Sequence, residues 1–103
     1  MKSTVKAEVF TKYRKQILRL KQDQRLFASH SNLYYALFIC WQQCGCINPF
    51  QVSRRMLMSY SNISSIATYH KCIKDLHAFG YIVYCPSYHP VNGSSVQWPA
   101  SIS

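Results

Sequence analysis

The chain has 103 residues, enough for one domain, and 49% of them are hydrophobic, a composition that supports a folded core and excludes wholesale disorder. Its 12 lysines and arginines face only 3 acidic residues, which gives a formal net charge of +9 at pH 7. Such a surplus favours a polyanionic partner, because phosphates attract it and release counterions on contact. The alternative is a basic protein that is merely soluble.

Residues 3–25 predict a basic amphipathic helix within a first segment over 1–28. No glycine or proline interrupts it, and lysines and arginines surround its apolar stripe. The helix packs either on its own domain or on a second copy of the chain. We expect a homodimer formed through it, because no other element is left over for that contact. The apolar positions, three and four apart for the most part, are Val5, Val9, Phe10, Tyr13, Ile17, Leu18 and Leu20.

A nearly all-apolar segment over 33–44 predicts a buried central helix. A cluster of capping residues at 29–32 precedes it, and Gly45 suits a left-handed C-cap just past its end. The apolar run is shorter than the roughly 20 residues that a bilayer span needs, and the charged N-terminus lacks the apolar core of a signal peptide. We therefore expect a cytoplasmic, nucleoid-associated protein.

Two more helices are predicted after this one. Ser53 caps a short helix, a turn over 59–62 follows, and Ile63 is expected to fill the space between two helices. Ser64 or Ser65 then caps a longer helix that reaches about residue 79 and stops at a glycine. The predicted inward face of this longer helix is Ile66, Tyr69, Ile73 and Leu76.

The remaining residues predict a β-hairpin, with strands over 81–85 and 94–98 and turn-forming residues between them. Residues 99–103 are expected to be a tail. The order of helix, short helix, turn, longer helix and hairpin is that of a winged helix–turn–helix. The fold class predicted is therefore mainly α with a C-terminal β-hairpin, a winged helix–turn–helix over 29–98 preceded by the amphipathic helix.

A helix–turn–helix places its second helix in the major groove of DNA. Projected at about 100° per residue, the outer arc of the longer helix contains Ala67 and Asp75 besides the candidate DNA-binding residues. The negative charge of Asp75 counts against DNA contact at that position. Arg54 and Arg55 of the short helix would clamp phosphates. The alternative for each of these positions is an ordinary surface residue that has no role in binding DNA. The residues expected to read or position DNA on the longer helix are Ser64, Ser65, Thr68, Lys71 and Lys74.

The predicted wing carries no lysine or arginine between Tyr84 and Trp98. Its contacts would come from uncharged groups, which bond phosphates without long-range attraction. Either the wing contributes little, with the basic N-terminal helix supplying the electrostatics, or it is purely structural. The candidate wing residues are Tyr88, His89, Asn92 and Ser94.

The sequence gives only weak support for a metal site or a catalytic site. Cys40, Cys44 and Cys46 with four histidines invite a metal site, but the first two lie one helical turn apart in an apolar segment and lack the paired knuckles of structural zinc. The five cysteines are expected to be reduced. With three acids and no glycine-rich loop, we expect no catalytic residue, no metal and no cofactor, and so not an enzyme.

One stretch resembles a known group of proteins. It runs Ser64-Ser65-Ile66-Ala67-Thr68-Tyr69-His70-Lys71-Cys72-Ile73-Lys74-Asp75-Leu76-His77-Ala78-Phe79-Gly80-Tyr81-Ile82, with Asn48-Pro49-Phe50 before it and Pro86-Ser87-Tyr88-His89-Pro90 after it. It resembles small winged-helix proteins of Bacteroides-type bacteria, which are often associated with conjugative transposons and related mobile elements. The similarity covers about 30–98 and is most specific over Thr68–Lys74. Ser65 departs from the basic residue expected there.

That resemblance implies DNA binding and a regulatory or element-handling role. We therefore predict a double-stranded DNA-binding protein, a transcriptional regulator or mobile-element accessory factor, that reads the major groove with helix 64–79. The second hypothesis is a winged-helix module that binds a protein or RNA without specific DNA binding.

Overall fold

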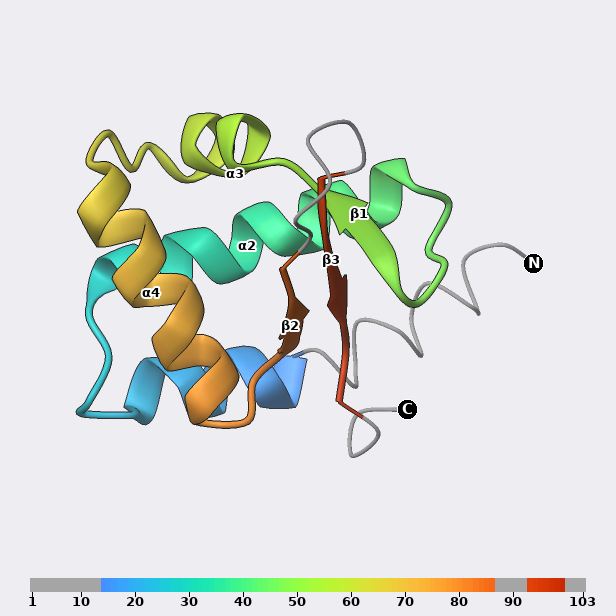
Figure 1. Cartoon of the computed structure of the whole chain (residues 1–103). Helices are drawn as coiled ribbons and strands as arrows, with labels where there is room; N and C mark the ends of the chain where they lie inside the picture. Colours follow the sequence, from blue (N-terminus) through green and yellow to red (C-terminus); the bar gives the residue numbers. More distant parts are fainter. Residues whose placement is uncertain (1–13, 87–92, 100–103) are drawn as a thin grey trace.

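The computed structural model describes residues 14–86 and 93–99. Helical turns over 14–22 are followed by α2 (Ala28–Gln43), β1 (Phe50–Val52), α3 (Arg54–Ser61), α4 (Ile66–Ala78), β2 (Val83–Cys85) and β3 (Ser94–Gln97). The molecule is a small α-rich domain with a three-stranded antiparallel sheet (Figure 1). Within the described residues, no helix has the length and apolar character needed to cross a membrane.

Helix α2 lies at the centre of the fold, in contact with α3, α4 and β1 (Figure 1). Leu33, Tyr34 and Leu37 on it are fully buried, which confirms the predicted central helix. Its predicted start is wrong, because the helix begins at Ala28 and the expected capping cluster lies within its first turns. The reason is His30, whose Nδ1 accepts a hydrogen bond from the backbone N–H of Phe27 at 2.9 Å and so satisfies a first-turn donor earlier in the chain.

The helical segment 14–22 packs on its own domain. Leu20 belongs to the same hydrophobic core as α2 and α4, whereas Leu18, which is also among the predicted apolar positions, is 48% exposed. Just after the segment, the Asp23 carboxylate accepts hydrogen bonds from Arg25 at 2.7 Å and from the Tyr81 hydroxyl at 2.9 Å. The predicted apolar positions Val5, Val9, Phe10 and Tyr13 lie outside the described residues.

Helices α3 and α4 begin at the predicted caps. The Met56 N–H donates to Ser53 Oγ at 3.1 Å, and the Thr68 N–H donates to Ser65 Oγ at 3.2 Å. Helix α3 continues through Ser61, three residues further than predicted, and its C-cap Asn62 is left-handed with φ 59°. Ile63 is buried, as expected of a residue that fills the space between two helices.

The inward face of α4 differs from the predicted one at a single position. Tyr69, Ile73 and Leu76 are buried as predicted, but Ile66 is 49% exposed and Cys72 takes its place. At about 100° per residue, Ile66 lies only about 20° round the helix from the buried Ile73, so its exposure reflects its place as the first residue of α4. A spacing of three from Tyr69 therefore does not suffice to bury it at the helix start.

The sheet contains a strand that the sequence did not predict. The predicted hairpin strands β2 and β3 pair antiparallel, with Tyr84 opposite Val96, and β1 pairs with the other edge of β3. Tyr81 and Ile82, expected in the first strand, precede it and are buried in the core. The central strand is thus β3, the last strand of the described residues.

Candidate nucleic-acid interface

The outer arc of α4 is exposed and basic. Measured from the buried residues of the helix at about 100° per residue, the outward direction contains Ala67, His70, Lys71 and Lys74, and all four are exposed. The two lysines thus lie where the sequence predicts them. The sequence analysis missed His70 because it placed Ile66 on the inward face of the helix. With Cys72 in place of Ile66 on that face, the outward direction turns toward His70.

Asp75 does not lie on this outer arc, contrary to the prediction. Its side chain is only 23% exposed and turns toward α2, where Oδ2 is 2.9 Å from Nε2 of His30. Because His30 Nδ1 accepts the Phe27 N–H, the proton of the neutral ring sits on Nε2, which donates to Asp75. The prediction failed because the partner lies 45 residues away in the sequence.

The same carboxylate also holds Lys71, whose Nζ donates to Asp75 Oδ2 at 3.1 Å. The hydrogen bond from His30, with a smaller contribution from Lys71, holds the pKa of Asp75 below its ordinary value. The lysine side chain is 64% exposed, so the pair is of the weak surface kind and the ammonium can exchange partners at little cost. Asp75 therefore positions Lys71 without removing it from the surface.

The only other acidic side chain in the described residues, Asp23, is also paired. It accepts from Arg25 and from Tyr81, and the hydrogen bonds from Arg25 are the main reason that the pKa of Asp23 lies far below its usual range. The Arg25 guanidinium also lies 3.8 Å from the centre of the Phe79 ring. No described carboxylate is thus left free to repel a polyanion.

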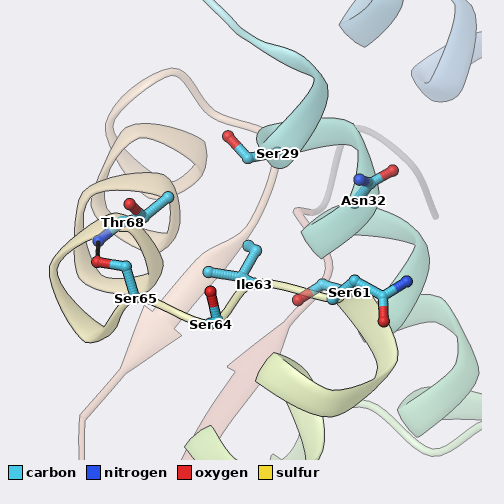
Figure 2. A pocket seen from close by; sticks show the side chains of 8 residues that line it. Ser29, Asn32, Ser61, Ile63, Ser64, Ser65 and Thr68 are labelled. Carbon is cyan, nitrogen blue, oxygen red and sulfur yellow. Dashed lines mark hydrogen bonds between the residues drawn. The ribbon is translucent and has the colours of Figure 1, made fainter.

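A polar hollow of about 250 Å³ lies between α2 and the turn from α3 to α4 (Figure 2). The structure brings the predicted residues Ser64, Ser65 and Thr68 together in its wall. Ser29 and Asn32 of α2 face them across the hollow; sequence reasoning saw these two only as caps of a helix start. The remaining lining residues are Ser61, Asn62 and Ile63.

The two arginines predicted to clamp phosphates are exposed at the start of α3, and neither lines the hollow. Arg54 is close enough to α4 for its positive charge to act on the hydroxyl of the buried Tyr69. Desolvation raises the pKa of that tyrosine strongly, and Arg54 opposes the rise. Arg55, one residue further along α3, projects about 100° away from Arg54.

Of the predicted wing residues, only Ser94 lies within the described part of the chain; Tyr88, His89 and Asn92 lie outside it. Ser94 begins β3 opposite Val52, and its Oγ accepts a hydrogen bond from the Tyr84 hydroxyl at 3.0 Å. Its side chain is therefore engaged within the sheet.

The described residues contain no group of three or more histidine, cysteine, aspartate or glutamate side chains that could hold a metal ion. All five cysteines are unpaired; Cys40 and Cys72 are buried, and burial raises the pKa of the Cys40 thiol. Compared with family models, curated proteins and solved structures, the chain matches none. Its likeness to mobile-element winged-helix proteins therefore stays a prediction.

Proposed function

We propose that the protein is a winged helix–turn–helix that binds double-stranded DNA with α4 in the major groove. The observation that carries the proposal is the outer arc of α4, which is exposed, presents Lys71 and Lys74, and has no unpaired carboxylate beside it among the described residues. A helix with side chains is about 10–12 Å wide, and the major groove is about 12 Å wide. The arc is thus suited to meet base edges while its lysines reach phosphates.

The order of elements supports the same proposal. Residues 62–65 join α3 to α4 as the turn of a helix–turn–helix would. The strands β2 and β3 follow α4 directly, and β3 lies between β1 and β2 (Figure 1). The paired strands β2 and β3 would then form the two sides of a wing beside the DNA.

Exposed basic residues elsewhere would add a sequence-independent attraction. Arg54 lies beside α4, and Arg14, Lys15 and Lys21 on the N-terminal helical segment are exposed, with no salt bridge within the described residues. Charges of this kind supply most of the nonspecific affinity of DNA-binding proteins. A role as transcriptional regulator or mobile-element accessory factor fits such a protein.

Dimerisation belongs to the same proposal, because two recognition helices double the footprint on DNA. Only one side of the segment 14–22 is available for this contact, since Leu20 on the other side packs into the core of its own domain. Leu18 on the same helix stays exposed and would be the contact. Sedimentation equilibrium of wild type beside Leu18→Glu tests this: we expect a dimer that the charge converts to monomer, and a monomeric wild type would contradict it.

A second candidate function, protein binding, is favoured by one observation. Ile39 of α2 and Met56 and Tyr60 of α3 are large, apolar and exposed. The Tyr60 hydroxyl donates to Gln43 Oε1 at 3.3 Å, and Gln43 is one turn after Ile39, which places these residues along the seam of the two helices. Exposed apolar clusters of this kind mark interaction surfaces.

Fluorescence anisotropy with a labelled random-sequence duplex across a salt series tests DNA binding. Wild type should show a steep fall of log affinity with log salt, and Lys71→Ala/Lys74→Ala should reduce that slope by about two. The matched control is Lys15→Ala/Lys21→Ala, which removes the same charge from the N-terminal helical segment and should reduce the slope by less than two, because that segment adds only a sequence-independent attraction. Absence of binding by wild type at low salt, or a slope reduced only in the control, would overturn the placement of α4 in the groove.

A further inference from the structure

The polar hollow has the chemistry of an uncharged oxyanion site. Hydroxyl and carboxamide groups from α2, the turn and α4 line it, and neither a carboxylate nor a basic side chain does (Figure 2). The Asn32 carboxamide offers two N–H donors, and each hydroxyl offers one. A ligand that only accepts hydrogen bonds would match this lining, and a phosphodiester group is such a ligand.

The hydrogen bonds within the wall leave donors available. Ser65 Oγ accepts from the Thr68 N–H, and Ser29 Oγ accepts from the Cys72 thiol at 3.4 Å. Because both hydroxyl oxygens accept, their own hydrogens stay free to donate. Ser61 differs, since its hydroxyl donates to the Leu57 carbonyl at 2.6 Å and it has no donor left for a ligand. The donor set of the hollow is therefore Ser29, Asn32, Asn62, Ser64, Ser65 and Thr68.

The hollow lies on the flank of α4 rather than on its outer arc. Thr68 lies on the side of the helix that faces α2, the same side as Asp75 with its contact to His30. A helix that fills a groove about as wide as itself has a phosphate backbone along each flank. The backbone on this flank would cross the hollow, and the hydroxyls there would face that backbone rather than base edges, because they lie to the side of the outer arc.

We infer that the hollow seats one backbone phosphate of the bound DNA through uncharged donors, chiefly Asn32 of α2 and Thr68 of α4. This inference rests on the proposed function and adds α2 to the contact surface. Because the contact bridges two helices, it would fix how deeply and at what angle α4 enters the groove. Phosphate contacts of this sort position a protein without reading sequence.

The test uses the difference between neutral and charged contacts. Lysine contacts release counterions and set the salt slope, whereas a hydroxyl or amide contact does not. Thr68→Val and Asn32→Ala should each weaken duplex binding by about tenfold at every salt concentration and leave the slope of log affinity against log salt unchanged. Thr68→Ser, which keeps the hydroxyl, and Ser59→Ala, an exposed hydroxyl outside the hollow, should stay within about twofold of wild type.

The outcomes separate this inference from the proposed function. Wild-type binding with Thr68→Val and Asn32→Ala no weaker than Ser59→Ala would overturn the hollow as a phosphate site and leave DNA binding intact. A flattened slope in either variant would also overturn it, since the contact would then involve charge. Failure of wild type to bind any duplex would overturn both the phosphate site and the proposed function.

A second measurement distinguishes a DNA phosphate from a free one. Amide chemical shifts of residues 64–68 are followed while duplex or inorganic phosphate is added at equal ionic strength. Shifts that saturate with stoichiometric duplex and stay unmoved by millimolar phosphate support the inference. Saturation by phosphate at lower concentration than by duplex would assign the hollow to a small anion and overturn it.

Discussion

The two halves of α4 use their polar side chains in opposite ways. In the N-terminal half, Thr68 and His70 are exposed, and neither side chain makes a hydrogen bond within the described residues. In the C-terminal half, Asp75 accepts from His30, and His77 Nδ1 accepts the backbone N–H of Tyr84 at 2.9 Å. The fold thus holds the helix by its last turns and leaves its first turns for a partner.

This difference shows what a polar residue on a helix means for function. Both halves contain a histidine and hydrogen-bonding groups, so composition alone does not separate them. A polar group is available to a ligand only where the tertiary structure has not already given it a partner. Substitutions of the partnered Asp75 and His77 should therefore change stability, and substitution of the unpartnered Thr68 should change binding.

The largest stability effect is expected at the partner of the C-terminal half. His30→Ala should lower the free energy of unfolding by about 3 kcal/mol, because a cavity replaces a ring that is only 1% exposed and both Phe27 N–H and Asp75 lose their partner. Urea denaturation measures this. The matched control, His70→Ala on the exposed arc, should change stability by less than about 0.5 kcal/mol; equal losses would show that the two histidines do not differ.

A smaller effect, with a defined pH dependence, is expected at Asp75. Its pKa is held below the ordinary 3.8, chiefly by the hydrogen bond from His30, so the carboxylate stabilises the fold above that value and the stabilisation is lost as pH falls through the lowered pKa. Asp75→Asn should cost about 1.5 kcal/mol at pH 7. Asp23 titrates in both proteins and cancels from the stability difference, which reports on Asp75 together with the groups bonded to it, His30 and Lys71.

Urea denaturation of both proteins between pH 7 and pH 2.5 gives that difference. It should be constant down to about pH 4 and shrink below it. A difference that persists unchanged at the lowest pH would mean that Asp75 acts through its shape rather than through its charge.

His77→Ala should have a lesser effect, about 0.7 kcal/mol. The ring is exposed, so water can replace it at the Tyr84 N–H once it is gone. The hydrogen exchange rate of the Tyr84 amide provides the direct measurement. We expect this amide to exchange faster in the variant while amides of α2 are unchanged; protection at Tyr84 equal to that of wild type would contradict the contact.

The smallest stability change is expected at Lys71, where a large change in binding should be found. Lys71→Met removes only an exposed i,i+4 ion pair, worth about 0.4 kcal/mol, yet it should weaken duplex binding at low salt by about tenfold. Thermal denaturation and anisotropy on the same preparation give both values. A stability loss of several kcal/mol with unchanged binding would reverse the roles of the two halves of α4.

The features that the sequence predicts well, such as the starts of α3 and α4, depend on residues within one helical turn of each other. The caps Ser53 and Ser65 hydrogen-bond backbone groups three residues away, so their effect is readable over one turn, and both helix starts are confirmed. The strand β1 was missed because its three residues give too short an alternation to recognise. It exists because Phe50 and Val52 pair with a strand more than 40 residues later.

The candidate site was predictable in part for the same reason. Ser64, Ser65 and Thr68 follow from the position of the turn, but their neighbours Ser29 and Asn32 come from a helix three elements earlier. Asp75 was misplaced outward because helical periodicity contains no information on His30. Contacts between distant segments decide which polar residues are exposed, and one sequence without such contacts cannot supply them.

The central position of β3 has a consequence for biosynthesis. Within the described residues, both β1 and β2 are edge strands that pair only with it, and β3 follows all the helices in the chain (Figure 1). During translation the helices can therefore collapse first, while the two edge strands wait unpaired until β3 has left the ribosome. A stop codon placed just before β3 would abolish the entire sheet, not only one strand, and expose two aggregation-prone edges.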